Sequence, residues 1–292
     1  MPKPELTAVI PVANMPGKLA NLESILRESS LLGIEVVIVH DKQDSVTGGE
    51  IEEIVKLLDS ELVSVITRSV YSPGRARNLG IERATGDWIC FWDSDDRPLP
   101  EVFLSMVRDA KLRGQEMALG KFCQVSGDRN EIFGTSETEV GRMPGIWRFA
   151  FKKESIDGLA FPAYRMGEDQ VFLAEVIVHF EDFFRCDEIV YEYVCGHVDQ
   201  LTKNRKAILE LEFAIEDMLR RISQTPNKNR IHFIFLSRQI LTILKHGSLR
   251  LKFKLLIFVV KALMLSGEDF LNVFSDEFKI SLKKQWQIRG NH

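Results

Sequence analysis

Three carboxylates stand within four residues, at Asp93, Asp95 and Asp96, directly after the apolar run at 88–92. Acids clustered at the end of a strand repel one another and cost stability unless a cation neutralises them. Carboxylate oxygens are the hard ligands that Mg²⁺ and Mn²⁺ prefer, and both metals also bind phosphate oxygens. The cluster therefore points to metal-assisted chemistry on a phosphate-bearing substrate. The plain alternative is a solvated acidic turn, because Asp is common in turns.

A second acidic pair, Glu168 and Asp169, follows Gly167 and opens an expected helix that runs to residue 179. Acids at a helix N-terminus often serve only to cap the helix and to complement its dipole. The functional interpretation makes one of them a general base that takes a proton from a nucleophile.

Basic residues gather around Pro73 and Gly74, where another helix is expected to begin: Arg68, Arg75 and Arg77. The N–H groups of a helix start and guanidinium donors both suit phosphate. Taken alone, the same residues also describe an ordinary solvated helix face.

Alternating strand and helix patterns are expected to bring these residues to one edge of a sheet. Nearly continuous apolar runs, typical of strands buried on both faces, occupy residues 6–11, 35–40, 63–67 and 88–92. Helical patterns occupy residues 18–32, 51–58, 75–84 and 100–112. The alternation predicts an α/β fold with a doubly wound, mainly parallel sheet. Ligands of such sheets bind beyond the carboxyl ends of the strands.

The pattern changes near residue 117. Short strand patterns lie at 118–125, 131–133, 145–151, 183–185 and 189–194, with the helix at 168–179 among them. From residue 207 onward the sequence predicts helices alone, with a polar break at 223–229. We therefore expect a sheet-containing domain at 1–205 and a helical C-terminal region at 206–292.

Taken in order, these segments resemble the catalytic domain of inverting family-2 glycosyltransferases with the GT-A fold, of the kind that builds bacterial envelope polysaccharides. The matching segments are TAVIPVAN, EVVIVHD, RARNLGIERATGDWICFWDSDD and GEDQVF. The resemblance covers about residues 6–204, and the ordered set is specific although each segment alone is weak. It implies transfer of a sugar from a nucleotide-diphosphate donor, with a UDP-sugar expected, to a hydroxyl of a glycan or lipid-linked acceptor. The 1–205 domain would then bind the nucleotide sugar and carry the catalytic residues.

The resemblance also implies roles for residues on the donor side. Pro11 and Val12 would lie against the nucleotide base, and Asp41 would bond to that base. Arg77 would help to order the nucleotide pocket, and Asp93 would lie near the ribose.

The cofactor that the resemblance implies is Mn²⁺ or Mg²⁺. Asp95, together with Asp93, would bind this metal, which would bridge the diphosphate. His197 is a further candidate for binding the metal or the diphosphate. Asp169 would be the general base that deprotonates the acceptor hydroxyl, and Glu168 would orient it or touch the acceptor. Asp96 would support the other aspartates.

The sequence departs from the family pattern in three places. Ala13-Asn14 stands where Tyr-Asn is usual, and HDKQD at 40–44 replaces two acids followed by Gly-Ser-Thr. Both departures surround the nucleotide base, so they leave the donor nucleotide open. Gln170 stands where an aromatic residue usually follows the acidic pair, which bears on the acceptor pocket.

The composition excludes several other classes of protein. An apolar fraction of 45% over 292 residues supports a folded core. The four cysteines form no CxxC pair, which argues against a disulfide framework or a zinc site. The polar N-terminus predicts no export signal, and no uncharged apolar stretch approaches the ~20 residues that span a bilayer. We therefore expect a cytoplasmic protein.

Charge is distributed unevenly within the net value of −4. Residues 228–267 contain eight Lys or Arg and no Asp or Glu, interleaved with aromatic and aliphatic residues. This composition is typical of a helix lying in a membrane interface. The protein would then be a peripheral membrane protein, bound to the anionic surface at the inner face of the cell membrane. The alternative is a helical cap whose apolar residues pack on the catalytic domain. Nucleic acid is not expected as a partner, because the segment carries no recognisable motif.

Two other functions remain open on these residues. A nucleotidyltransferase uses a similar sheet and a carboxylate-bound metal, although PVANMPGK is only a faint version of the Gly-rich, Lys-containing loop that would favour it. A non-catalytic glycan- or membrane-binding module on the same fold would show neither donor hydrolysis nor transfer with Mn²⁺. The presence of Asp93, Asp95 and Asp169 argues against such a module.

Overall fold

The computed structural model describes residues 3–15, 19–127, 129–180, 182–195, 205–224 and 230–290. These residues form two compact units that interleave along the chain. The first unit contains the described residues of Met1–Thr135, Gly145–Ala163 and Phe180–His197, and the second contains those of Ser136–Pro144, Tyr164–His179 and Val198–His292. Two short stretches from the middle of the chain thus belong with the C-terminal helices. The functional division at residue 205 stays a prediction.

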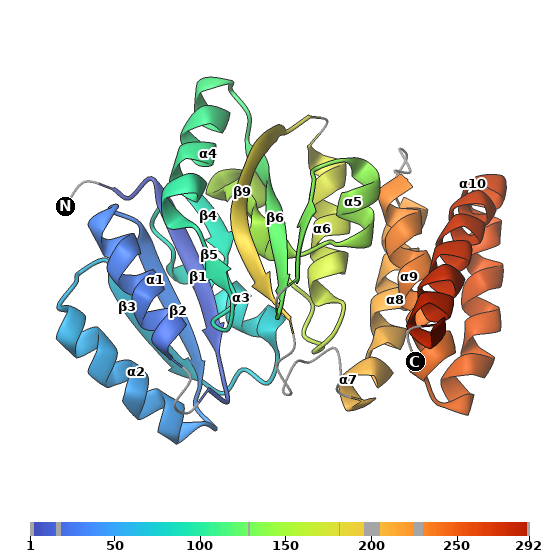
Figure 1. Ribbon diagram of the computed structural model, residues 1–292, viewed down its shortest axis with the longest axis horizontal. Coiled ribbons are helices and arrows are strands. Elements are labelled where there is room, and N and C mark those ends of the chain that lie inside the picture. The colour runs from blue at the N-terminus through green and yellow to red at the C-terminus, as the bar shows by residue number, and fades with distance from the viewer. Residues whose placement is uncertain are drawn as a thin grey trace. The chain divides into compact units, whose positions relative to one another are not determined.

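The first unit is built on a nine-stranded sheet in the order β3-β2-β1-β4-β8-β6-β9-β5, with β7 beside β6 (Figure 1). Its parallel strands β3, β2, β1 and β4 are Val63–Arg68, Glu35–Asp41, Leu6–Val12 and Trp88–Phe91. The helices that connect them are α1 (Ala20–Leu31), α2 (Ser45–Leu58) and α3 (Pro73–Arg83). Strand–helix alternation therefore produces the parallel sheet that the apolar runs predict.

The other half of the sheet mixes strand directions. It comprises β5 (Arg97–Pro98), β6 (Met117–Ser126), β7 (Arg129–Phe133), β8 (Phe149–Lys152) and β9 (Phe184–Val194). β6 is parallel to β9 but antiparallel to β7 and β8, and β8 runs antiparallel to β4. Helix α4 (Pro100–Leu112) and the 3-10 turns η1 (Ile146–Arg148) and η2 (Lys153–Ile156) complete the unit. The two strands expected at 183–185 and 189–194 form the single strand β9.

Helix α3 packs closely on β1 because residue 80 is a glycine. A Cβ added to Gly80 would lie 2.1 Å from Cγ1 of Val9, so a larger residue would push the helix off the strand. Val9 is fully buried, and the contact fixes α3 against the sheet.

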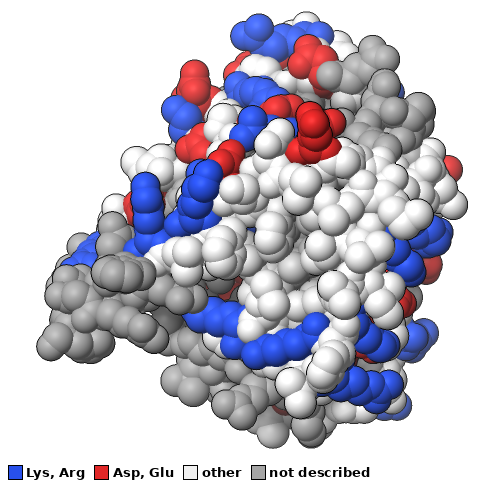
Figure 2. All heavy atoms as spheres, turned by 90° about the vertical axis from the view of Figure 1, so that its right-hand side faces the viewer, with Lys and Arg blue, Asp and Glu red and all other residues white. Residues whose placement is uncertain are grey.

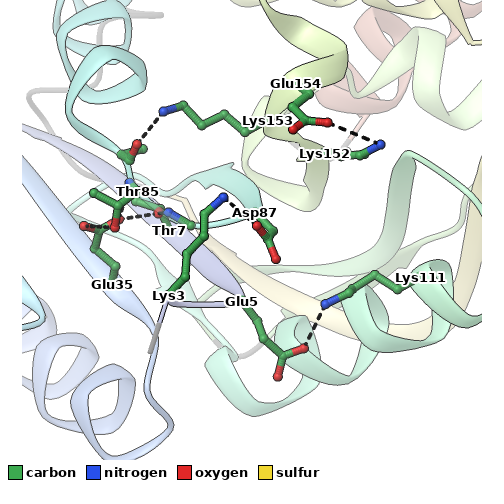
Figure 3. A network of polar contacts seen from close by, with 12 residues as sticks. Lys3, Glu5, Thr7, Glu35, Thr85, Asp87, Lys111, Lys152, Lys153 and Glu154 are labelled. Atoms are coloured by element: carbon green, nitrogen blue, oxygen red, sulfur yellow. Dashed lines mark hydrogen bonds and ion pairs between the residues drawn. The ribbon is translucent and has the colours of Figure 1, made fainter. Parts of the chain in front are cut away.

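Ion pairs close the edge of the sheet where the parallel strands begin (Figure 3). Lys3 binds Asp87 at 2.6 Å, and the Glu35 carboxylate accepts hydrogen bonds from the Thr85 amide and hydroxyl. A hollow of about 760 Å³ lies at this edge and is lined by four lysines. All four already have carboxylate or carbonyl partners: Lys3, Lys111, Lys152 and Lys153. The pairs therefore hold this edge of the sheet together.

The second unit is helical. It contains α5 (Glu137–Arg142), α6 (Glu168–His179), α7 (Arg205–Leu209), α8 (Leu211–Gln224), α9 (Arg230–His246) and α10 (Leu249–Gly290). Helices α5, α6, α7, α8 and α10 all pack against α9. Residue Gly267 interrupts α10 with non-helical angles of φ 48° and ψ −117°. Across the described residues, no helix is long and apolar enough to cross a membrane.

A buried ion pair holds the second half of α10. Glu277 is 4% exposed and lies 2.9 Å from Nε of Arg142 in α5, with Arg238 of α9 at 3.9 Å. A buried carboxylate needs such partners, because an unpaired charge is costly inside a protein. The contact therefore fixes this part of α10 against two other helices.

Candidate functional site

The donor-side residues lie at the edge where the parallel strands end. Pro11 and Val12 are the last residues of β1 and pair in register with Val39 and His40 of β2. Asp41 ends β2 one residue further on. The structure therefore brings Pro11, Val12 and Asp41 to the same edge, with Val12 buried and the other two half-buried.

The segments after β1 and β2, where the sequence departs from the family pattern, are joined by a hydrogen bond. The Asp44 carboxylate accepts hydrogen bonds from the amides of Asn14, at 2.6 Å, and Thr47, at 3.2 Å. The second bond caps α2, which explains why this helix begins six residues before the predicted start at 51. Asp44 thus joins the end of β1 to the start of α2.

Asp41 organises the loop that precedes α3. Its carboxylate accepts hydrogen bonds from the amides of Gln43, at 3.2 Å, and Tyr71, at 3.3 Å. Tyr71 has a positive φ of 60°, and its side chain is exposed. The residue expected to bond the nucleotide base therefore also holds the backbone of a neighbouring loop.

Residues 93–96, here called the carboxylate turn, follow β4 at the same edge. Arg77 from α3 donates to Oδ1 of Asp93 at 3.0 Å, and its guanidinium lies 5.5 Å from the ring centroid of Phe161. Arg77 is only 5% exposed, so a buried cation from one element orients the first carboxylate of the turn.

Tyr191 of β9 holds the turn from its other side. Its hydroxyl donates to Oδ2 of Asp96 at 3.0 Å and accepts from the Asp93 amide at 3.1 Å. The Val194 amide donates to Oδ1 of Asp96 at 2.8 Å. Burial, reinforced by the charges of Asp93 and Asp95, raises the pKa of Asp96 to about 8. Asp96 therefore links the turn to β9, while Asp93 and Asp95 are more exposed.

An aromatic stack lies beside the turn and was missed by the sequence reasoning. The Trp147 ring stacks on Tyr191, with centroids 4.4 Å apart, and on Tyr193, at 5.5 Å. The available signal was the spacing of the two tyrosines in β9, because residues two apart in a strand share a face. Nothing in the sequence indicated that Trp147 meets them.

The carboxylate turn has the donor chemistry for a divalent cation. Asp93 and Asp95 offer hard oxygen ligands at a partly open strand end. Burial is the main cause of the high pKa of Asp96, and the charges of Asp93 and Asp95 add a smaller repulsion that a cation would relieve. The described residues contain no group of three or more His, Cys, Asp or Glu able to hold a metal by themselves. A bound Mn²⁺ or Mg²⁺ would therefore complete its shell with substrate phosphate and water. His197 lies outside the described residues.

The second acidic pair begins α6, in the other unit. Gly167 precedes it with a φ of +86°, a conformation that suits glycine, and an added Cβ would lie 2.9 Å from that of Ala214. Glu168 is 6% exposed, whereas Asp169 is half-buried and accepts a hydrogen bond from the Gln170 amide at 2.8 Å. Asp169 is thus the more accessible of the two acids.

Gln170 fastens the acidic pair to α9. Its side-chain oxygen accepts a hydrogen bond from the Gln239 amide group at 3.1 Å. The departure from an aromatic residue at this position therefore has a structural partner within the second unit.

A sheet whose parallel strands end at a carboxylate turn is the architecture of GT-A glycosyltransferases, and solved structures of that class match the chain. TarS 1–349 from S. aureus, in complex with UDP, is 15% identical with a TM-score of 0.69, covering 92% of this chain and 83% of that one. The mannosyltransferase PcManGT from Pyrobaculum calidifontis, in complex with GDP-Man and Mn²⁺, is 13% identical with a TM-score of 0.56, covering 94% and 87%. These likenesses confirm the predicted fold.

The family follows from the sequence match. The model of glycosyl transferase family 2 matches residues 7–170, and the chain belongs to this family. The succinoglycan biosynthesis protein ExoO of Rhizobium meliloti is 29% identical over 154 residues, or 52% of this chain and 43% of that protein. The amylovoran biosynthesis glycosyltransferase AmsB of Erwinia amylovora is 31% identical over 96 residues, or 31% and 30%. The chain thus spans less than half the length of both relatives.

Proposed function

We propose that the protein is a metal-dependent, inverting glycosyltransferase acting at the cytoplasmic face of the membrane. It would move a sugar from a UDP-sugar to a hydroxyl of a glycan or lipid-linked acceptor in the synthesis of a bacterial polysaccharide. The observation that carries the proposal is the carboxylate turn, held by Arg77 and Tyr191 at the ligand edge of the sheet. Supporting it, TarS structures contain UDP and UDP-GlcNAc, and the two bacterial relatives are named for polysaccharide biosynthesis.

The donor would bind along the ends of β1, β2 and β4. Pro11 and Val12 would pack against the base, Asp41 would accept a hydrogen bond from it, and Asp93 would approach the ribose. The Asp41 carboxylate accepts from the Tyr71 amide, and the Asp93 carboxylate accepts from the Arg77 guanidinium. The Asp93 amide also donates to the Tyr191 hydroxyl, so both residues are held in place before the donor arrives. Such preorganisation lowers the entropic cost of binding.

Asp95 and Asp93 would hold Mn²⁺ or Mg²⁺. When bound, the cation supplies positive charge that stabilises the leaving diphosphate. Arg77 cannot replace that charge, because its guanidinium is already committed to Asp93. Its role would be to fix the orientation of the Asp93 carboxylate.

Asp169 would serve as the general base. As the acceptor oxygen bonds to the anomeric carbon, the bond from that carbon to the diphosphate oxygen breaks, UDP leaves, and the acceptor proton passes to Asp169. Attack on the face opposite the leaving group inverts the anomeric centre. Glu168, nearly buried, would orient Asp169 or contact the acceptor.

The first test is a thermal-shift panel of nucleotide sugars with and without Mn²⁺. At least one donor should stabilise the protein only when the metal is present, and the Asp95→Asn variant should lose that stabilisation. Asp187→Asn is a matched control, because the Asp187 side chain is 92% exposed on β9. The absence of metal-dependent stabilisation by any donor would refute the transferase proposal.

The second test addresses the base. Asp169→Asn should retain donor binding and lose transfer, while Asp276→Asn, at an exposed acid of α10, should retain both. Transfer at the normal rate by Asp169→Asn would remove Asp169 as the base. Release of pyrophosphate in place of UDP would instead identify a nucleotidyltransferase.

A further inference from the structure

The basic, acid-free segment at 228–267 has two structurally different parts. In α9 most of the large apolar residues are buried within the second unit, among them Phe233, Ile234, Phe235 and Leu236, and Leu244 near its end is 42% exposed. This part is therefore a packing element of the second unit. The first half of α10, from Leu249 to the interruption at Gly267, has apolar residues on its outer surface as well.

Six large apolar side chains form an exposed stripe on this half-helix, here called the α10 face. They are between 46% and 83% exposed: Leu249, Phe253, Leu256, Ile257, Val260 and Met264. At about 100° per residue their positions fall within an arc of about 100°, and at 1.5 Å per residue they extend over about 22 Å. The opposite side of the helix is buried, through Leu251, Leu255, Phe258 and Ala262. The α10 face is therefore a second apolar side, unused by the packing of the described residues.

Basic side chains border the α10 face. Arg250 and Lys261 lie along one margin by helical position, Lys252 lies along the other, and all three are exposed. Lys254, deeper on the first margin, pairs with Glu212 of α8 at 3.1 Å. Figure 2 shows this side of the molecule, where uncharged residues form a broad area bordered and crossed by Lys and Arg.

We propose that the α10 face docks on an anionic lipid bilayer. An exposed apolar stripe between rows of long basic side chains suits an interface, because the apolar residues enter the boundary between headgroups and acyl chains. The lysine stems remain along that boundary and carry their charges to the lipid phosphates. The inference goes beyond the proposed transfer reaction and does not depend on it.

The charges argue against a second copy of the chain as the occupant. A two-fold contact would place two such faces together, each without an Asp or Glu between residues 228 and 267. Like charges would then meet at a closing interface, which opposes association. An anionic surface supplies the opposite charge along both margins.

The test is co-sedimentation of the full chain, without nucleotide, with vesicles of phosphatidylcholine and phosphatidylglycerol in equal parts. Binding should be strong at low salt, weaker at high salt, and weak to phosphatidylcholine alone. Phe253→Ser/Leu256→Ser should reduce the partition coefficient at least about tenfold, since two inserting side chains are lost. Lys252→Gln/Lys261→Gln should reduce it about 25-fold, or about fivefold for each charge.

Matched controls come from the other half of α10. Leu271→Ser/Phe278→Ser also removes two exposed apolar residues, 50% and 44% exposed, but in a stretch that contains acids. This variant should bind vesicles as the parent chain does. Because all the changes are on the surface, unchanged circular dichroism is expected throughout.

Three results would overturn the proposal. One is failure of the parent chain to bind anionic vesicles at low salt, and another is undiminished binding by Phe253→Ser/Leu256→Ser. The third is a concentration-dependent dimer in sedimentation equilibrium that the same variant abolishes, which would make the α10 face an interface between copies. A transfer assay measured separately keeps the fate of this proposal distinct from that of the enzymatic one.

Discussion

Removing one oxygen from Tyr191 should loosen the carboxylate turn. In Tyr191→Phe the ring remains stacked on Trp147, but both hydrogen bonds through the hydroxyl disappear. Each such bond contributes about 0.5–1.5 kcal/mol, and the Asp93 amide and the buried Asp96 carboxyl lose a partner. Asp96 keeps its bond to the Val194 amide, which limits the loss. We expect destabilisation by about 2–3 kcal/mol.

The assay is differential scanning fluorimetry, followed by calorimetric titration with UDP in the presence of Mn²⁺. For a unit of this size, each kcal/mol lost from the free energy of unfolding lowers Tm by about 2–4 °C, so Tm should fall by roughly 4–12 °C. UDP should bind more weakly, because part of its binding energy must now order the turn. Tyr193→Phe is the control, since within the described part of the chain the Tyr193 hydroxyl makes no hydrogen bond. If the two variants were equally stable and bound UDP equally well, Tyr191 would not hold the turn.

Three further substitutions test the packing around the site and the second unit. Arg77→Lys keeps the charge but loses the stacking on Phe161. It should lower the free energy of unfolding by about 1–2 kcal/mol in thermal melts and weaken UDP binding. Arg75→Lys, at an exposed position, should change neither the stability nor the binding. Gly80→Ala should lower the free energy of unfolding by about 1–3 kcal/mol in a urea titration, because the added methyl group would overlap Val9. A variant as stable as the wild type would mean that α3 can move away from β1 at no cost. Glu277→Gln should destabilise the second unit by about 1–3 kcal/mol, because two arginines lose their buried partner. The loss should appear as faster hydrogen exchange of the backbone amides in α5 and α10. Unchanged exchange would show that the ion pair contributes nothing to stability.

The parallel half of the sheet could be predicted because its strands are buried on both faces and read as continuous apolar runs. The helix at 100–112 was predicted at both ends, since Pro100 marks its first turn. The start of α2 was predicted late, because two glycines at 48–49 disguise a helix whose cap, Asp44, lies before them. The arrangement of Asp41, Asp93 and Asp95 at one edge follows from strand order alone.

The contacts that hold the site could not be predicted in the same way. Arg77 was expected in the nucleotide pocket, but its pairing with Asp93 depends on how α3 packs on β1. Tyr191 is far along the chain from Asp96, and only the pairing of β9 with its neighbours brings them together. Likewise α9 and the first half of α10 have the same basic, apolar composition, and tertiary packing decides which apolar residues are buried.

Gly267 sets the length of the α10 face. In sequence the apolar spacing continues beyond it, through Leu271, Phe278 and Leu282, as if one helix carried one stripe. A straight helix would present these residues in line with Phe253 and Met264, over about 50 Å in all at 1.5 Å per residue. The break turns the helix axis and divides that stripe into two short surfaces with different charge. The break at a single glycine thus limits the length of this amphipathic sequence that can contact one flat surface.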